Sequence, residues 1–235
     1  MIRLRHLLET VLSERVSDVV YHSTGIYGLE SIVKSDTFQL SPLQMAGKID
    51  RGWAEENDLR DYYYMSVARS VDSDFIREYS SSNIVFRLDG RKLNANLKSI
   101  AFNYGQEGGR RGIEVTVGDE MEDRIISNKP EIRGFSKYVT GIYVPTGVVI
   151  RLAVQGHQDD FTDAVQQLTD KGIELYNCNV SDYVNMIRSG EPTDYTTKTI
   201  INNAISKPTF NSKCKTSMDD FMKMVNSLVQ YYENY

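Results

Sequence analysis

The segment that most constrains the fold is residues 19–24 (VVYHST), followed almost at once by residues 28–35 (GLESIVKS). The β-branched and aromatic residues of the first segment predict a short strand. The second has its apolar residues at i, i+3 and i+4, which predicts a short helix. His22 therefore stands near the end of a predicted buried strand. Such a histidine usually hydrogen-bonds a local turn, so its role depends on the motifs that follow.

Composition sets the broad class. The chain has 235 residues, of which 40% are hydrophobic and 25% charged, enough for one large domain with a buried core. A net charge of −5 argues against coating of nucleic acid but leaves a local basic groove open. The two cysteines, Cys178 and Cys214, have no CxxC spacing, which argues against a disulfide framework or structural zinc. No apolar run approaches the ~20 residues of a membrane span. We expect a soluble, cytoplasmic protein.

Periodicity along the chain predicts an α+β fold with a mixed or antiparallel β core and flanking helices. Asp89-Gly90 predicts a turn, and the long segment 43–60, with Trp53, suggests a functional loop. Helices are predicted at 3–16, 158–170 and 217–233, and strands at 38–42, 61–70, 84–90, 113–117, 138–144 and 173–176.

Three units are expected along the chain. Residues 1–188 form the α+β domain, whose last part is a strand–helix–strand extension of the sheet. Residues 189–215 are polar and predict a loop or tether. Residues 216–235 predict an amphipathic helix that packs on the domain or on a partner.

Glu120 and Glu122 are the most chemically suggestive pair after His22. Residues i and i+2 of an extended segment face the same side, so both carboxylates can line one surface. Neighbouring carboxylates raise one another's pKa, which suits acid–base chemistry or stabilisation of a developing cation. The alternative is a solvated acidic turn balanced by Arg124.

Two weaker features also carry charge. Residues 105–112 form a glycine-rich basic segment, which fits either a hairpin connection or a phosphate or nucleic-acid contact through Arg110 and Arg111. His157, Asp159 and Asp160 could serve a metal-dependent hydrolase, but acidic residues at a helix start are equally explained by capping.

Three segments together resemble the ADP-ribosyltransferase fold. They are residues 19–24 with Leu29 and Ile32, residues 65–70 (MSVARS), and residues 122–126 (EDRII) followed by 138–144 (YVTGIYV). The last match is similar to the branch of toxins that modify DNA bases, and the whole also resembles proteins of tailed bacteriophages. The resemblance spans roughly residues 19–145. The chain departs from the pattern at Ser23, where the family usually has glycine.

The resemblance implies that NAD is consumed as a substrate, its nicotinamide–ribose bond breaking through an oxocarbenium-like state. Glu122, with Glu120 and His22, would be catalytic: Glu122 would stabilise the positive charge and His22 would hold the other ribose. It further implies that a tyrosine stacks on nicotinamide and that Arg69 pairs with the pyrophosphate. The implied NAD-binding residues are His22, Ser23, Thr24, Tyr63, Tyr64, Ser66 and Arg69, with no metal.

Two functions remain open on this basis. The first is an ADP-ribosyltransferase-like enzyme that modifies a macromolecule, with DNA or RNA as candidate acceptors. The second is a non-catalytic phage accessory or structural protein that keeps a degenerate version of the fold and binds a protein partner or a second copy through its terminal helices. If the chain is phage-encoded, either would act in the host cytoplasm. Neither requires a membrane.

Overall fold

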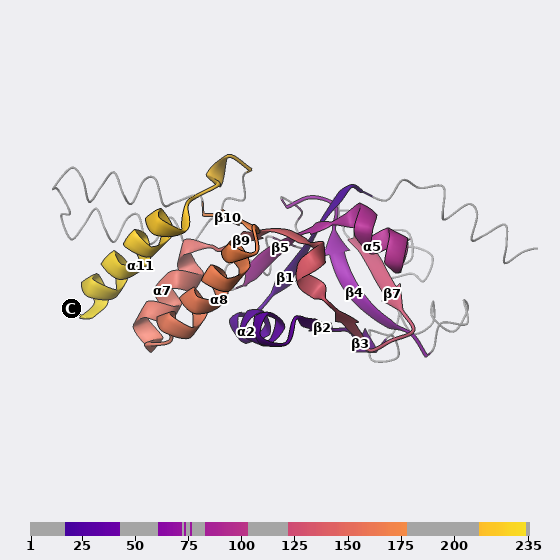
Figure 1. The fold of residues 1–235 in the computed structure, drawn as a ribbon, viewed down its shortest axis with the longest axis horizontal. Helices are drawn as coiled ribbons and strands as arrows, with labels where there is room; N and C mark the ends of the chain where they lie inside the picture. The colour runs from indigo at the N-terminus through magenta and orange to yellow at the C-terminus, as the bar shows by residue number, and fades with distance from the viewer. Residues whose placement is uncertain are drawn as a thin grey trace, which may run out of the picture.

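The computed structural model describes residues 17–42, 61–71, 73, 76, 83–102, 122–177 and 212–233. A mixed sheet runs through the described chain in the strand order β10-β9-β5-β1-β4-β7-β6, with β3 paired to β4 and a separate pair β2–β8 (Figure 1). The strands are β1 Val19–Thr24, β2 Thr37–Gln39, β3 Ser41–Pro42, β4 Tyr63–Ala68, β5 Ile84–Asp89, β6 Lys98–Phe102, β7 Glu122–Ser127, β8 Glu131–Arg133, β9 Val139–Tyr143 and β10 Glu174–Tyr176.

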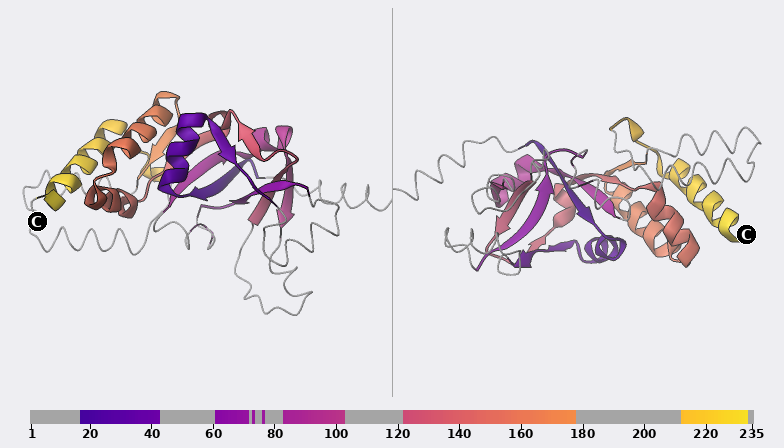
Figure 2. Two further views of the ribbon diagram at one scale, coloured as in Figure 1. Left: turned by 90° about the horizontal axis from the view of Figure 1, so that it is seen from below. Right: turned by 180° about the vertical axis from the view of Figure 1, so that it is seen from behind.

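The predicted α+β class is confirmed. Every described pairing in the large sheet is antiparallel except that of β9 with β10, which is parallel and is bridged by two helices. Figures 1 and 2 show α7, α8 and α11 gathered at the β9–β10 end and α5 at the other end. The helices are α2 Ile26–Ser35, α5 Gly90–Asn96, α7 Thr146–Gln155, α8 Gln158–Asp170 and α11 Met218–Glu233.

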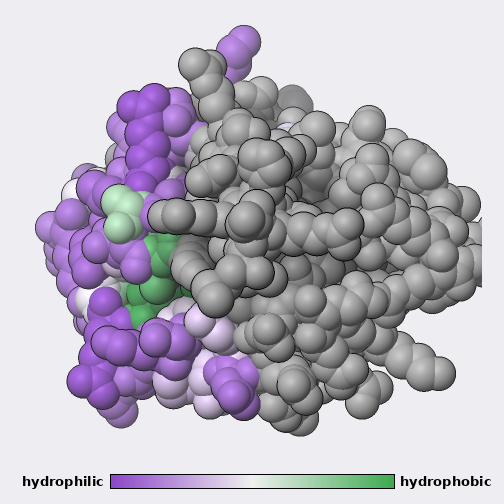
Figure 3. Space-filling view, turned by 90° about the vertical axis from the view of Figure 1, so that its right-hand side faces the viewer, coloured by the Kyte–Doolittle hydropathy of each residue, from purple (hydrophilic) through white to green (hydrophobic). Residues whose placement is uncertain are grey.

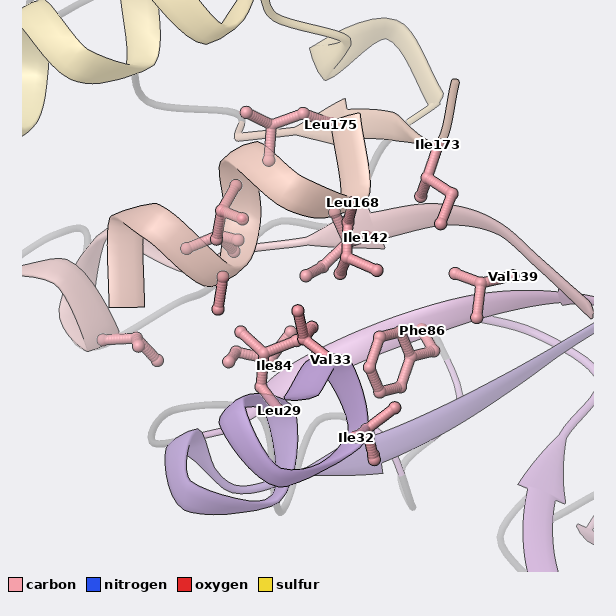
Figure 4. Close-up of a cluster of buried hydrophobic side chains, with 14 of the residues drawn as sticks. Leu29, Ile32, Val33, Ile84, Phe86, Val139, Ile142, Leu168, Ile173 and Leu175 are labelled. Carbon is pink, nitrogen blue, oxygen red and sulfur yellow. The ribbon is translucent and has the colours of Figure 1, made fainter. Parts of the chain in front are cut away.

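The main core lies between the sheet and the helices α2, α7 and α8. Leu29, Ile32 and Val33 of α2 point toward Phe86 of β5 and Leu168 of α8 (Figure 4). This is the i, i+3, i+4 stripe that the sequence shows, and all three residues are buried. The stripe fixes α2 against the sheet directly after β1, and so fixes the strand end that carries His22.

Most of the predicted elements that fall within the described residues are confirmed. β6, β8 and α5 were not predicted as elements, and three further details differ. The sequence analysis left 146–155 unassigned, and it is helix α7, whose Val148, Val149 and Ile150 favour strands locally but are buried in the core. Asp89-Gly90 does not make a turn. Asp89 instead caps helix α5 by accepting a hydrogen bond from the Lys92 amide. The predicted strand at 38–42 is divided into β2 and β3.

The C-terminal helix packs on its own chain. Helix α11 contacts α7 and α8, and its apolar residues Phe221, Met224, Val225 and Leu228 are buried. The apolar face that could have docked a partner is therefore largely used inside the molecule. The predicted helix at 3–16 and the tether up to residue 211 lie outside the described residues.

The sequence analysis argues against a disulfide framework, but Cys214 is disulfide-bonded. Residues 214–216 pair with the edge of β10: the Asn177 amide donates to the Cys214 carbonyl at 2.9 Å, and Lys215 forms an antiparallel bridge with Tyr176. The chain's other cysteine, Cys178, follows Asn177 in sequence but lies outside the described residues. The spacing of the cysteines in the sequence could not reveal the disulfide at Cys214, because tertiary contacts bring residues 214–216 to the edge of β10.

The described surface at the end that carries α5 and β7 is mainly hydrophilic, with a small hydrophobic strip (Figure 3). Of the helices that the structure describes, none has both the length and the apolar character needed to cross a membrane.

Gly141 of β9 gives a test of the packing around β10. A Cβ atom at Gly141 would lie 2.7 Å from Cε2 of Tyr176, whose ring stacks on Tyr143 at 4.5 Å between centroids. We expect Gly141→Ala to lower the free energy of unfolding by about 1–3 kcal/mol, because the added methyl group overpacks a nearly buried site. Denaturant unfolding measures this loss.

The control for Gly141 is a double-variant cycle with Tyr176→Leu, which removes the ring that the new methyl group meets. The cost of Gly141→Ala should be smaller in that background. Equal costs in both backgrounds would show that the clash with Tyr176 is not the cause.

Candidate functional site

The three segments that carry the sequence motifs lie on neighbouring strands. β1 holds residues 19–24, β4 holds 63–68 and β7 begins at Glu122, and the sheet order is β1-β4-β7. Tyr21 pairs with Ala68, and Ala68 pairs with Glu122. Segments that are about a hundred residues apart in the sequence therefore meet in one cross-strand row.

The ladder between β1 and β4 is broken. β1 pairs with β5 over residues 19–24, but it is in register with β4 at the single pair Tyr21–Ala68. Beyond that pair the His22 side chain reaches β4 instead, with Nδ1 2.8 Å from the Ser66 carbonyl oxygen. The imidazole thus satisfies a backbone carbonyl that would otherwise need a ladder partner. We call this boundary between β1 and β4 the ladder break.

The environment of His22 fixes its protonation state. Burial lowers the pKa of His22 to about 4, and the hydrogen bond with the Ser66 carbonyl opposes that shift only in part. A carbonyl oxygen can only accept, so Nδ1 carries the proton and donates it. In a neutral imidazole Nε2 is then an unprotonated acceptor. Within the described ranges the ring has no other hydrogen-bond partner, so Nε2 is suited to accept from a ligand hydroxyl.

The ring of His22 is held in place by aromatic packing. It meets the edge of Phe38 at 4.8 Å between centroids and 89° between planes, and Phe38 in turn stacks on Phe135. Phe38 comes from β2, which pairs with β8, so the small sheet supports the histidine. The sequence analysis did not single out Phe38, and nothing in its local pattern marks it.

His22 and Glu122 belong to opposite faces of the sheet. The row of His22 continues through Phe86, Ile142 and Leu175, which face the main core. Glu122 lies in the adjacent row with Ala68 and Tyr21, and adjacent rows alternate faces. The register therefore does not bring both positions to one side.

The remaining predicted residues divide by position. Ser23 adjoins His22, and its buried hydroxyl oxygen has no hydrogen-bond partner among the described residues. Thr24 lies against Gly28, where an added Cβ atom would come within 2.4 Å of the Thr24 hydroxyl. Ser66 contributes its carbonyl, and Arg69 directly follows β4 at the end where Glu122 begins β7. Most of the predicted set therefore surrounds the ladder break.

The predicted tyrosines lie farther away. Tyr63 and Tyr64 pair with Ser127 and Ile126, at the end of β4 and β7 opposite to Glu122. At about 3.3 Å per residue, the separation along the strand is roughly 13–17 Å. Glu120, Arg110, Arg111 and the segment 43–60 lie outside the described residues, as does the strand predicted at 113–117.

A polar and aromatic row that the sequence analysis did not single out continues from Tyr21. It runs through Arg87 and Gly141 to Glu174 on the face shared with Glu122. Tyr176 donates a hydrogen bond to Glu174, and Lys215 donates another at 2.8 Å. These bonds lower the pKa of Glu174, and burial together with this bond raises the pKa of Tyr176 to about 12. The signal in the sequence that could have revealed this row was Arg87, a charged residue within the mainly apolar strand β5.

The described residues do not support the metal-dependent hydrolase as an alternative, because they provide no set of metal ligands. His157, Asp159 and Asp160 are exposed at the start of α8, where the acidic residues lie in the first turn. No group of three or more His, Cys, Asp or Glu side chains in the described chain could hold a metal ion.

No protein-family model, curated protein or solved structure matches this chain.

The low pKa of His22 predicts a pH dependence of stability. The folded chain keeps His22 neutral down to about pH 4, whereas the unfolded chain protonates it near the ordinary value of 6.5. Its contribution is therefore fully present above pH 6.5 and is lost as the pH falls from 6.5 toward 4. We expect a loss of roughly 1–3 kcal/mol from this group over that range.

Denaturant unfolding between pH 4 and 7.5 measures this loss, with His22→Asn as the matched variant. Asparagine keeps an N–H donor near the Nδ1 position and does not titrate in this range. Subtracting the two profiles removes the carboxylates common to both. A flat difference profile would contradict a depressed pKa for His22.

Proposed function

We propose that this protein is an NAD-consuming, ADP-ribosyltransferase-like enzyme that transfers ADP-ribose to a macromolecule. The observation that carries the proposal is the adjacency of β1, β4 and β7, because it gathers His22, Arg69 and the start of β7 around the ladder break. The adjacency of the three matching segments supports the proposal. Nucleic acid is the proposed acceptor, following the similarity to DNA-modifying toxins.

The protonation state of His22 fits a ribose. A ribose hydroxyl can donate to Nε2, whereas a phosphate at neutral pH offers acceptors and would be repelled by a bare lone pair. NAD has two riboses, so His22 and Glu122 need not reach the same ring. In this proposal His22 holds the adenosine ribose at the ladder break, and Glu122 serves the nicotinamide ribose.

The reaction exchanges one bond for another at C1′ of the nicotinamide ribose. The nicotinamide–ribose bond breaks with its electron pair leaving on nicotinamide, and a bond forms to the acceptor nucleophile, which loses a proton. Glu122 would stabilise the positive charge that develops on the ribose. Arg69 would pair with the pyrophosphate.

NAD cleavage tests the proposal. The full chain is incubated with NAD labelled on the adenosine side and with DNA, RNA or cell lysate, and both label transfer and nicotinamide release are measured. We expect Glu122→Gln to reduce both by roughly 10²-fold or more, because the amide cannot balance the developing charge. His22→Asn should weaken NAD binding.

Glu131→Gln is the matched control. Glu131 lies on β8, bonds Arg133 and Gln39, and takes no part in the ladder break, so its variant should keep wild-type turnover. No nicotinamide release by the wild type, or equal rates for the Glu122 and Glu131 variants, would rule out the enzyme.

The alternative is a non-catalytic binding protein. The placement of positions 22 and 122 in rows on opposite faces favours it, because a degenerate site would retain the scaffold without a shared reaction centre. NAD binding without turnover would support this alternative. For either function the proposed location is the cytoplasm. The disulfide at Cys214 argues against this location, because disulfides are rare in reducing compartments.

A further inference from the structure

The segment directly before α11 lies along the edge of β10. We call residues 214–216, which pair with that edge, the strap (Figure 1). The Asn177 amide donates a hydrogen bond to the Cys214 carbonyl at 2.9 Å. The Thr216 amide donates another to the Leu175 carbonyl, also at 2.9 Å. The strap therefore covers backbone groups of β10 that would otherwise form an open sheet edge.

The described non-covalent contacts hold the strap only weakly. Besides the two backbone hydrogen bonds, Lys215 donates to Glu174 at 2.8 Å, but 62% and 37% of these two side chains are exposed. An ion pair between exposed groups adds little stability, and ordering a short segment costs conformational entropy. The disulfide at Cys214 is the covalent link at the N-terminal end of the strap. It is therefore the contact that decides whether this end stays on β10.

The elements on either side of the strap have anchors of their own. The buried Asn177 side chain donates to the Val144 carbonyl at 2.8 Å and accepts from the Thr146 hydroxyl at 3.2 Å. Ser217 caps α11 by accepting a hydrogen bond from the Asp220 amide at 3.1 Å, and the apolar residues of α11 are buried. Breaking the disulfide would therefore free the N-terminal end of the strap while β10 and α11 stay in place.

The surroundings of Cys214 favour exchange with a thiol. Cys214 is partly exposed, and its sequence neighbours Lys213 and Lys215 are exposed. Glu174 offsets part of the charge of Lys215, to which it is bonded. Positive charge stabilises a cysteine thiolate, and partial exposure admits a reacting thiol. Accessible disulfides whose sulfur leaves readily as a thiolate are the labile and regulatory ones.

We propose that the disulfide at Cys214 is a redox switch that locks the strap on β10 when oxidised and releases its N-terminal end when a low-molecular-weight thiol of the glutathione class reduces it. The sequence has two cysteines, so Cys178 is the intrachain partner available to Cys214. The inference does not depend on the proposed function. It reconciles a disulfide with the proposed cytoplasmic location, because the strap would be released there.

The exchange balances with two molecules of thiol. The first, as its thiolate, attacks the sulfur of the partner cysteine, the disulfide bond breaks, and its electron pair leaves on Cys214, which the neighbouring lysines favour. The second attacks the mixed disulfide and releases the remaining protein thiol. Two protein thiols and one small-molecule disulfide result, so the protein gains two electrons and two protons.

Amide hydrogen exchange of the full chain tests the release. The protein is purified without reductant, treated with reduced glutathione at neutral pH, and alkylated in a parallel sample to count thiols by mass. We expect the Asn177 amide to exchange roughly tenfold faster or more after reduction, because its acceptor on the strap moves away. Glutathione disulfide should restore the slow rate.

The Val144 amide is the internal control. It donates to the Tyr176 carbonyl at 3.0 Å, so it reports whether β10 itself stays in the sheet. Its exchange rate should not change on reduction. Cys214→Ser should reproduce the reduced state without any thiol. If this variant does not fold, the reduced wild type still provides the measurement.

Two lysine variants test the role of charge. Lys213→Gln should slow reduction by glutathione roughly 2- to 5-fold, because one cation beside the leaving sulfur is lost. Lys223→Gln is the matched control, since Lys223 is also an exposed lysine but lies within α11 and pairs with Asp220. Its rate should equal that of the wild type.

Three results would overturn the switch. The first is a native chain whose disulfide resists reduced glutathione. The second is an Asn177 amide that stays protected after two thiols have appeared. The third is an equal acceleration at Asn177 and Val144, which would show that the disulfide holds the whole fold together. Equal reduction rates for the two lysine variants would overturn the part assigned to Lys213.

Discussion

The hydrogen bond from His22 Nδ1 to the Ser66 carbonyl is the interaction on which the candidate site depends. A regular ladder between β1 and β4 would satisfy that carbonyl with a backbone amide. The side chain takes the place of the amide, so the two strands remain neighbours while their ladder stays open beyond Tyr21–Ala68. The same bond holds the proton on Nδ1, so Nε2 is the imidazole nitrogen that can accept a hydrogen bond.

The two faces of the sheet differ in what covers them and in the polar groups that they carry. One face carries the row of His22 and is covered by α2, α7 and α8, whose buried side chains supply most of the core. The other carries Tyr21, Ser23 and the start of β7, together with the polar contacts of Arg87 and Glu174. The stable face anchors the histidine, and the second face leaves polar groups near the surface.

The local sequence pattern was sufficient to predict a helix or strand where its apolar residues match the residues that are buried. The stripe of α2 and the apolar, β-branched start of β5 predicted their elements because burial and propensity agree there. It failed for α7, where the β-branched residues Val148 and Val149 are helical because tertiary packing outweighs their preference. The disulfide at Cys214 was missed for a related reason, since residues 214–216 approach β10 only through tertiary pairing.

For the site, the sequence supplied residue types but not their sides of the sheet. Strand order could be inferred only from the resemblance, and a one-residue change of register would exchange the faces of His22 and Ser23. The register of β1 with β4 and of β4 with β7 decides that Glu122 shares a face with Ser23 rather than with His22.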